Sequence, residues 1–301
     1  MNAETQCVKN NLGLVCITTS DEVRYKTVTR KALLQMDETA QAEKLRSIYA
    51  ANIGILQKAI RFCAARAIRL YRMTSALFPF SDEALGARIL ETQFAPALAE
   101  IGAGALAGGL RLVLHPDQFV VLSSDSNDVI ANSVKILKMH AKTMDLLMQP
   151  RSEWAAMNIH GGKSGRIDKL VATVESLPEE IRSRITFEND EYAYSSKEIL
   201  EVCRRARVPM VFDAHHHVCR EGLEDYNDKS VADAFWAARE TWANPANQMV
   251  HISNGREKFG DRAHSDLISA MPGVFRFAPW IEVEAKHKEI AIARLQKDWL
   301  R

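Results

Sequence analysis

The amino-acid sequence predicts an α/β protein, a single (β/α)₈ TIM barrel over residues 1–301 with its active site at the C-terminal ends of the strands. Eight short apolar runs alternate with longer amphipathic stretches, which is the pattern of parallel strands joined by helices. The length of 301 residues with 47% hydrophobic content suits a barrel, which typically has about 250 residues in one domain. Histidines and acids also recur where the predicted strands end.

The elements follow in order along the chain. The apolar runs predict strands at residues 11–17, 67–73, 111–115, 154–160, 184–188, 209–213, 248–253 and 280–285. Amphipathic spacing predicts helices after the strands, among them residues 39–66, 128–148, 196–205 and 230–242. We expect Ser196 to cap the third of these helices. The small residues at 103–109 predict a loop leading into the third strand.

A doubly wound open sheet is the main alternative to the barrel. Such a sheet usually has a glycine-rich phosphate-binding turn after its first strand. Residues 14–18 (Leu-Val-Cys-Ile-Thr) contain no glycine. The sequence therefore favours the closed barrel.

Composition restricts the compartment and the class of protein. The five cysteines (Cys7, Cys16, Cys63, Cys203 and Cys219) are scattered without a Cys-x-x-Cys pair, which argues against a disulfide framework or a thiolate zinc site and for a reducing compartment. Residues 1–11 contain no apolar signal core, and no run of 18 apolar residues occurs. We expect a soluble, cytoplasmic protein with no membrane segment, and nothing indicates an obligatory protein partner. The net charge of +1 means that any surface for nucleic acid is local.

Histidines and carboxylates mark the ends of the predicted strands. Seven of the nine histidines lie at or just beyond these ends: His115, His160, His215, His216, His217, His251 and His264. Glu188, Asp213 and Glu284 occupy the same position on other strands. The strand ends of a barrel meet at one mouth, and buried carboxylates need a partner. Mixed imidazole and carboxylate ligands suit Mn²⁺, Zn²⁺ or Fe²⁺, so we predict a centre for two or three divalent ions.

Two local alternatives stay open. His216 lies three residues after Asp213, which is a chelating spacing if the chain turns there. By strand alternation, however, His215 shares the face of Asp213 and competes with His216 as the ligand. Glu282 and Glu284 both face inward, and Glu284 is nearer the mouth. Lys286 lies on that face beyond Glu284, where its charge is suited to holding a phosphate.

Several motifs in the same order resemble the ultraviolet damage endonuclease family over nearly the whole chain. They are His-Pro-x-Gln at 115–118, His-x-Gly at 160–162, Glu-Asn-Asp-Glu at 188–191, Asp-x-x-His-His at 213–217, His251, His264 and Val-Glu-Ala-Lys at 283–286. The resemblance implies an endonuclease IV-like barrel and three divalent ions, commonly manganese, with zinc or magnesium as alternatives. It also implies incision on the 5′ side of ultraviolet photoproducts, and of abasic sites, in double-stranded DNA.

The resemblance also implies roles for individual residues. The metal ligands are His115, His160, Glu188, Asp213, His216, His251, His264 and Glu284. Gln118 and Phe119 match the family's lesion-probing pair. Some relatives have Tyr in place of Phe119 and an aromatic residue in place of Leu14, and a lysine, modified in at least one relative, stands in the place of Met249.

The expected mechanism combines metal ions with a DNA-binding rim. Glu188 and Glu284 bridge ions, Lys286 holds a phosphate, and Phe119 fills the gap left by an extruded nucleotide. Basic residues gather in the loops of the predicted rim and suit phosphates, although acids lie among them: Arg24, Lys26, Arg30, Lys31, Lys163, Arg166, Arg256, Lys258 and Arg262. Two rival hypotheses are a metal-dependent sugar isomerase or epimerase on a similar barrel and a non-catalytic, metal-stabilised protein that binds DNA lesions.

Overall fold

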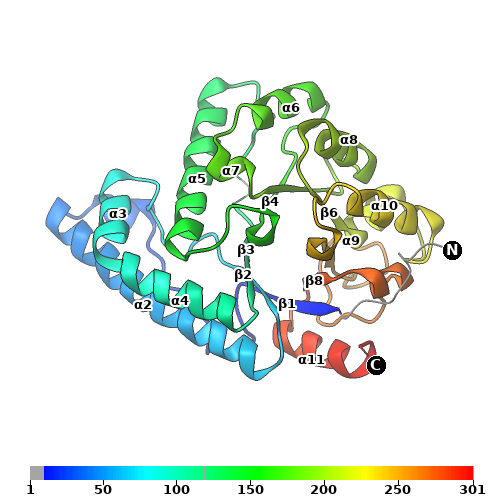
Figure 1. Cartoon of the computed structure of the whole chain (residues 1–301), viewed down its shortest axis with the longest axis horizontal. Coiled ribbons are helices and arrows are strands. Elements are labelled where there is room, and N and C mark those ends of the chain that lie inside the picture. Colours follow the sequence, from blue (N-terminus) through cyan, green and yellow to red (C-terminus); the bar gives the residue numbers. More distant parts are fainter. Residues whose placement is uncertain (1–9, 118, 301) are drawn as a thin grey trace.

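The structure is a computed structural model that describes residues 10–117 and 119–300. Its eight parallel strands form a closed barrel in chain order, so the predicted fold class is confirmed. Figure 1 shows the long helices arranged around the outside of the strands. The strands are β1 (Asn11–Val15), β2 (Leu70–Met73), β3 (Arg111–Leu114), β4 (Met157–His160), β5 (Ile185–Glu188), β6 (Met210–Asp213), β7 (Met249–Ile252) and β8 (Trp280–Val283).

Each predicted strand is present, with ends within three residues of the expected ones. The main helices are α1 (Arg30–Leu34), α2 (Glu38–Ala65), α3 (Ala84–Ile89), α4 (Ala95–Ala107), α5 (Asn127–Leu146), α6 (Ile167–Glu175), α7 (Glu179–Arg182), α8 (Ser196–Ala206), α9 (Ala214–Glu221), α10 (Lys229–Arg239) and α11 (Lys288–Asp298). Short segments are the π-helix η1 (Leu90–Phe94) and the 3₁₀ helices η2 (Glu153–Ala155), η3 (Pro245–Asn247) and η4 (Gly273–Phe277). Among the described residues, no helix is both long and apolar enough to span a bilayer.

Three local predictions were wrong. Most of residues 103–109 belongs to α4, because alanine is a strong helix former and Leu98, Ile101 and Ala105 give this helix a buried face. The cap of α8 is Ser195 rather than Ser196, and it forms a capping box in which its hydroxyl and the Glu198 carboxylate bond each other's backbone N–H. A helix was expected after each strand, but in the described chain only the 3₁₀ helix η4, and no α-helix, lies between β7 and β8.

The end of the barrel where the strands begin is closed by apolar side chains. Met249 and Trp280 are register neighbours on β7 and β8, and they pack in one buried cluster with Leu70, Val113, Ala156, Val211 and Trp242. The buried guanidinium of Arg111 lies here, where it donates to the backbone carbonyls of Glu153, Trp154 and Asn247. This layer separates the barrel interior from solvent at that end.

The next layer toward the mouth is polar. It contains Arg72 on β2, Asn158 on β4, Thr186 on β5, His251 on β7 and Glu282 on β8, all of them buried. The parallel register places His251 beside Glu282 and, at the outer edge of the layer, His160 beside Glu188 and Asp213 beside His251. Because side chains alternate in and out along a strand, apolar and polar layers can stack inside one barrel.

Candidate metal centre

The predicted ligands gather at the mouth of the barrel. Six lie within one residue of the ends of the consecutive strands β3 to β8: His115, His160, Glu188, Asp213, His251 and Glu284. His216 comes from the first turn of α9, and His264 from the loop between β7 and β8. Closure of the barrel is what brings residues separated by up to 169 positions together.

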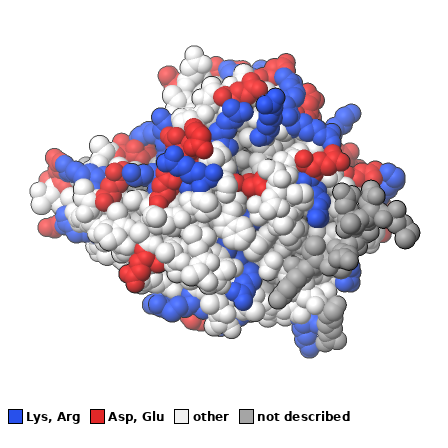
Figure 2. Space-filling view, in the orientation of Figure 1, with Lys and Arg blue, Asp and Glu red and all other residues white. Residues whose placement is uncertain are grey.

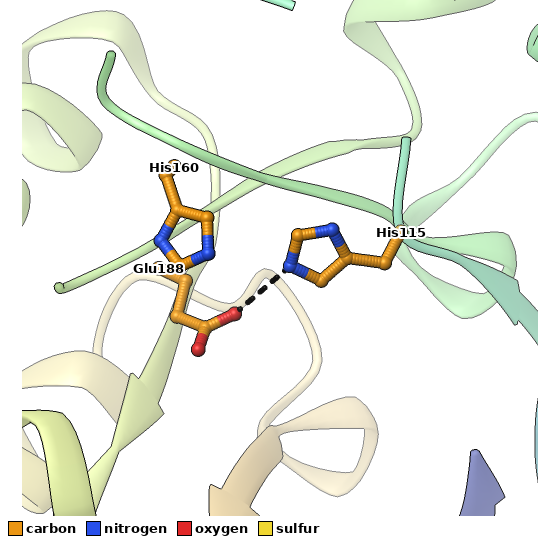
Figure 3. Close-up of side chains that lie close together, drawn as sticks. All are labelled: His115, His160 and Glu188. Atoms are coloured by element: carbon orange, nitrogen blue, oxygen red, sulfur yellow. Dashed lines mark ion pairs between the residues drawn. The ribbon is translucent and has the colours of Figure 1, made fainter. Parts of the chain in front are cut away.

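Glu188 lies at the centre of the group. Its side chain is 1% exposed, and its carboxylate oxygens lie 3.1 Å from His251 Nδ1, 3.3 Å from His216 Nδ1 and 3.4 Å from His115 Nε2. Figure 3 shows His115 and His160 converging on this carboxylate from neighbouring strands. Asn158 Nδ2 donates to Glu188 Oε2 at 2.5 Å, which fixes the orientation of the carboxylate from below.

The start of α9 brings only one of the three consecutive histidines, His216, beside Glu188 and Asp213. Asp213 caps this helix and accepts from the backbone N–H of His216 at 2.7 Å, so the first turn brings His216 back over Asp213. The Nδ1 of His216 lies 2.9 Å from the carbonyl oxygen of Asn189 and 3.3 Å from Glu188, while Nε2 lies 3.6 Å from the carboxylate of Glu191. His215 is instead bonded to Tyr226 and the Asp261 carbonyl, and His217 to Ser196 and Ser230.

A buried ion-pair network supports the other side of the mouth. His251 Nε2 lies 2.5 Å from Glu282 Oε2, so its Nδ1 faces Glu188 and, at 3.5 Å, Glu284. Arg72 Nη1 lies 3.1 Å from Glu282 and 2.6 Å from Glu284. A histidine whose second nitrogen meets a carboxylate in this way is held in one orientation toward a metal.

Two predicted residues lie at the edge of this arrangement. His264 Nδ1 is 3.9 Å from Glu284 Oε2, and its side chain is partly exposed on a loop that is bridged to Gly255. Lys286 follows Glu284 with an exposed side chain and forms no ion pair within the described residues, while its backbone N–H donates to the Ser265 carbonyl. His264 therefore borders the cluster, and the ammonium of Lys286 is open to solvent.

Burial and neighbouring charges shift the pKa values of residues in the cluster. Burial works to raise the pKa of Glu188, but the positive charge of His251 and hydrogen bonds from His115 and His216 together outweigh burial and hold this pKa well below its ordinary value. For Asp213 burial prevails and raises the pKa. For His160 burial lowers the pKa, which favours the neutral ring that a metal requires.

The donor atoms fit divalent ions. Three groups, each with ligand atoms within 4.8 Å of one another, are His115–His160–Glu188, Glu188–Asp213–His216 and His251–Glu282–Glu284. Within the described residues, the buried Nδ1 of His160 and Oδ2 of Asp213 have no hydrogen-bond partner. Buried polar atoms without a partner are costly, and nitrogen and carboxylate oxygen are the ligands that Mn²⁺ and Zn²⁺ take.

The predicted lesion-probing residues, Gln118 and Phe119, follow β3 in the sequence. Gln118 lies outside the described residues. Phe119 follows β3 on the rim of the mouth and its side chain is 66% exposed, whereas the next residue, Val120, is buried. Val120 thus anchors the loop, and the Phe119 ring is left in solvent.

The predicted rim cations differ in their surroundings. Lys163 and Arg166 both pair with Asp125, and Arg24 pairs with Asp21 at 3.1 Å. Arg30 pairs with Glu83 at 2.9 Å. Lys26, Arg256 and Lys258 are exposed and form no ion pair in the described part of the chain. Figure 2 shows Lys and Arg interspersed with Asp and Glu over the face in view, in keeping with the balanced net charge.

Sequence reasoning missed Arg72 and left Glu282 unassigned. A signal for Glu282 existed, because alternation already placed it inside the barrel. Arg72 gave no local signal, since its partners Glu282 and Glu284 are 210 and 212 positions away. The two positions where relatives differ are both buried: Leu14 pairs with Tyr71 across β1 and β2, and Met249 belongs to the apolar layer below His251.

Comparison with known proteins identifies relatives of this chain. A profile of the family described as UV-endonuclease UvdE matches residues 10–300. The UV DNA damage endonuclease of Nostoc sp. strain PCC 7120 is 54% identical over 291 residues, covering 96% of this chain and 90% of that protein. The enzyme of the same name from Deinococcus radiodurans is 46% identical, with 95% and 94% covered.

Solved structures share the fold. The crystal structure of SacUVDE superposes with a TM-score of 0.82 at 24% identity, covering 96% of this chain and 98% of that one. Endonuclease IV from Thermus thermophilus matches with a TM-score of 0.59 at 18% identity, covering 81% and 94%. The profile match spans both the strands and the residues gathered at their ends. The chain belongs to the UV-endonuclease UvdE family.

Proposed function

We propose that the chain is a metal-dependent UV DNA damage endonuclease that hydrolyses a phosphodiester bond of double-stranded DNA next to a lesion. The observation that carries the proposal is Glu188, a buried carboxylate that belongs to two of the three groups of candidate ligands at one mouth. Two relatives that bear the name of this activity, at 54% and 46% identity, support it.

The finer assignment is incision on the 5′ side of ultraviolet photoproducts, and at abasic sites. Three divalent ions occupy the centre in this proposal, with Mn²⁺ preferred and Zn²⁺ or Mg²⁺ as alternatives. Their ligands are the eight residues predicted above. Two of the three groups of ligand atoms consist of these residues alone, and the third joins His251 and Glu284 with Glu282, which is paired with Arg72.

Bound ions of this kind supply positive charge for the phosphate and lower the pKa of water toward neutrality. The chain's own residues hold the geometry. Glu188 is shared between neighbouring ligand groups and kept in place by Asn158. Arg72 holds Glu284 against the cluster, and the exposed ammonium of Lys286 is free to contact a DNA phosphate.

Lesion recognition is assigned to the β3 loop and the rim. The exposed ring of Phe119 fills the gap in a stack from which a nucleotide has left, a contact worth about 1–3 kcal/mol. Gln118 meets the base that has lost its partner. Among the rim cations, Lys26, Arg256 and Lys258 are the ones most ready for phosphates, whereas Arg24 and Lys163 must first exchange a carboxylate partner.

One gel tests the proposal. End-labelled duplex DNA, irradiated or not, is incubated with purified protein and Mn²⁺, and we expect nicks only in the irradiated duplex. Glu188→Gln keeps the size of the side chain and removes its charge, so nicking should fall to background while the circular dichroism spectrum is kept. Glu201→Gln on the outer face of α8 is the matched control and should nick normally.

The outcomes also separate the rivals. Binding of irradiated duplex without nicking across Mn²⁺, Zn²⁺ and Mg²⁺ would support the non-catalytic lesion-binding protein. Neither binding nor nicking, together with turnover of a ketose or aldose, would support the sugar isomerase. Wild-type nicking by Glu188→Gln would remove this residue from the metal centre.

A further inference from the structure

The turn after β5 holds one aromatic side chain out in solvent. Asp190 accepts hydrogen bonds from the backbone N–H groups of Tyr192 at 2.7 Å, of Ala193, and of Tyr194 at 3.3 Å, and its own N–H donates to the Tyr194 carbonyl at 2.9 Å. Tyr194 is buried and its hydroxyl donates to the Lys163 carbonyl at 2.7 Å. The turn is therefore fixed at both ends.

Tyr192, between these anchors, is 66% exposed. A large ring left in water forgoes the free energy of apolar burial, and the backbone that carries it is fixed by Asp190. The residue before it reaches the metal centre, since Glu191 Oε2 lies 3.6 Å from His216 Nε2. Tyr192 thus lies on the rim, next to the His216 side of the cluster.

A cation from another loop covers one face of this ring. Arg262 Cζ lies 4.2 Å from the centroid of Tyr192. Arg262 is exposed, stands two residues before His264 and forms no carboxylate ion pair within the described residues. Its loop is tied down, because the Asp261 carbonyl bonds His215 at 2.8 Å and the Arg256 N–H donates to the Ala263 carbonyl at 2.8 Å.

We propose that Tyr192 and Arg262 form a second DNA-contacting element, in which the open face of the Tyr192 ring stacks on a nucleobase and Arg262 neutralises an adjacent phosphate. A fixed, exposed ring beside a guanidinium that has no carboxylate partner among the described residues complements both parts of a nucleotide, the flat base and the anionic backbone. Phe119 follows β3 and Tyr192 follows β5, so the two exposed rings hold different nucleotides on either side of the β4 end.

This inference rests on the proposed function, and the test separates the two. Single-turnover nicking of a duplex with one defined lesion is measured with Mn²⁺-loaded protein, as a function of protein concentration. Tyr192→Ala should raise the half-saturating concentration about 5- to 150-fold, the equivalent of about 1–3 kcal/mol of stacking, with little change in the limiting rate. Tyr192→Phe retains the ring and should stay within about twofold of the wild type.

Arg262→Ala should also raise the half-saturating concentration and lower the slope of its salt dependence by about one phosphate contact. Met148→Ala is the matched control, because Met148 is 61% exposed beyond the end of α5. Unchanged saturation in Tyr192→Ala, or an equal effect of Met148→Ala, overturns the proposal. If the wild type does not nick, the proposed function fails by itself. Fluorescence anisotropy with the same duplex then tests the DNA contact alone: weaker binding by Tyr192→Ala supports the contact, and binding equal to that of the wild type refutes it.

Discussion

Arg72 is the most informative residue to perturb, because it is a buried cation on which two carboxylates depend. Its Nη1 lies 3.1 Å from Glu282 and 2.6 Å from Glu284, and the three side chains are 9%, 0% and 13% exposed. Arg72→Met roughly keeps the volume and removes the guanidinium from Glu282 and Glu284, so that Glu282 keeps only His251 beside it. Breaking one side of a buried pair costs about 3–5 kcal/mol, which for a chain of this size lowers Tm by roughly 5–8 °C.

The assay is urea unfolding followed by circular dichroism, with chelator present so that no metal replaces the lost charge. Arg72→Met/Glu282→Leu should regain about 1–3 kcal/mol relative to the sum of the single variants, because the second change removes the orphaned charge. Arg204→Met is the control: its partner Glu240 is well exposed, and such pairs are worth less than about 1 kcal/mol. A loss below about 1 kcal/mol for Arg72→Met, or strictly additive variants, would show that the network does not stabilise the barrel.

Two further predictions concern pH and lesion choice. Burial lowers the pKa of His140 on α5 from its ordinary 6.5 to about 4, so the unfolded chain binds a proton more readily and unfolding free energy should fall as the pH drops from about 6.5 to 4, by about 2 kcal/mol between pH 7 and 5. His140→Leu should be less sensitive to acid by this amount in urea unfolding at the two pH values, and an unchanged pH dependence would refute the assignment. Phe119→Ala should weaken nicking of a well-stacked photoproduct more than of an abasic site that opens easily; equal losses in single-turnover gels would reject the stacking role.

The barrel could be predicted because its strands are buried on both faces. Met210–Asp213 is apolar until its last residue, and Ile185–Glu188 contains only Thr186 as a polar residue before its last; the acid that ends each run also marks the mouth. Segments without such a boundary were harder. Residues 103–109 combine alanine with glycine, and only the packing of Ile101 and Ala105 decides that the helix continues.

The candidate site was predictable in composition and less so in detail. Which of the three neighbouring histidines lies beside Asp213 and Glu188 depends on where α9 begins, because a period of two points to His215, whereas the helix directs His215 to Tyr226. The pairing of Arg72 with Glu282 joins β2 to β8 across the closure of the barrel, so no local pattern contains it. The state of a rim cation such as Lys163 depends on a loop acid, Asp125, 38 positions earlier.

The layering of the barrel interior constrains how the proposed centre can be filled. Glu188, Asp213 and Glu282 are buried carboxylates, and Arg72 is the buried cation that faces Glu282 and Glu284. Below them, the layer around Met249 and Trp280 blocks access from the end where the strands begin. Cations that balance the remaining acids must therefore enter from the mouth, the side on which Phe119 and Tyr192 are exposed. In the proposed function, metal and DNA consequently share one entrance, and a bound DNA strand closes the route by which the ions leave.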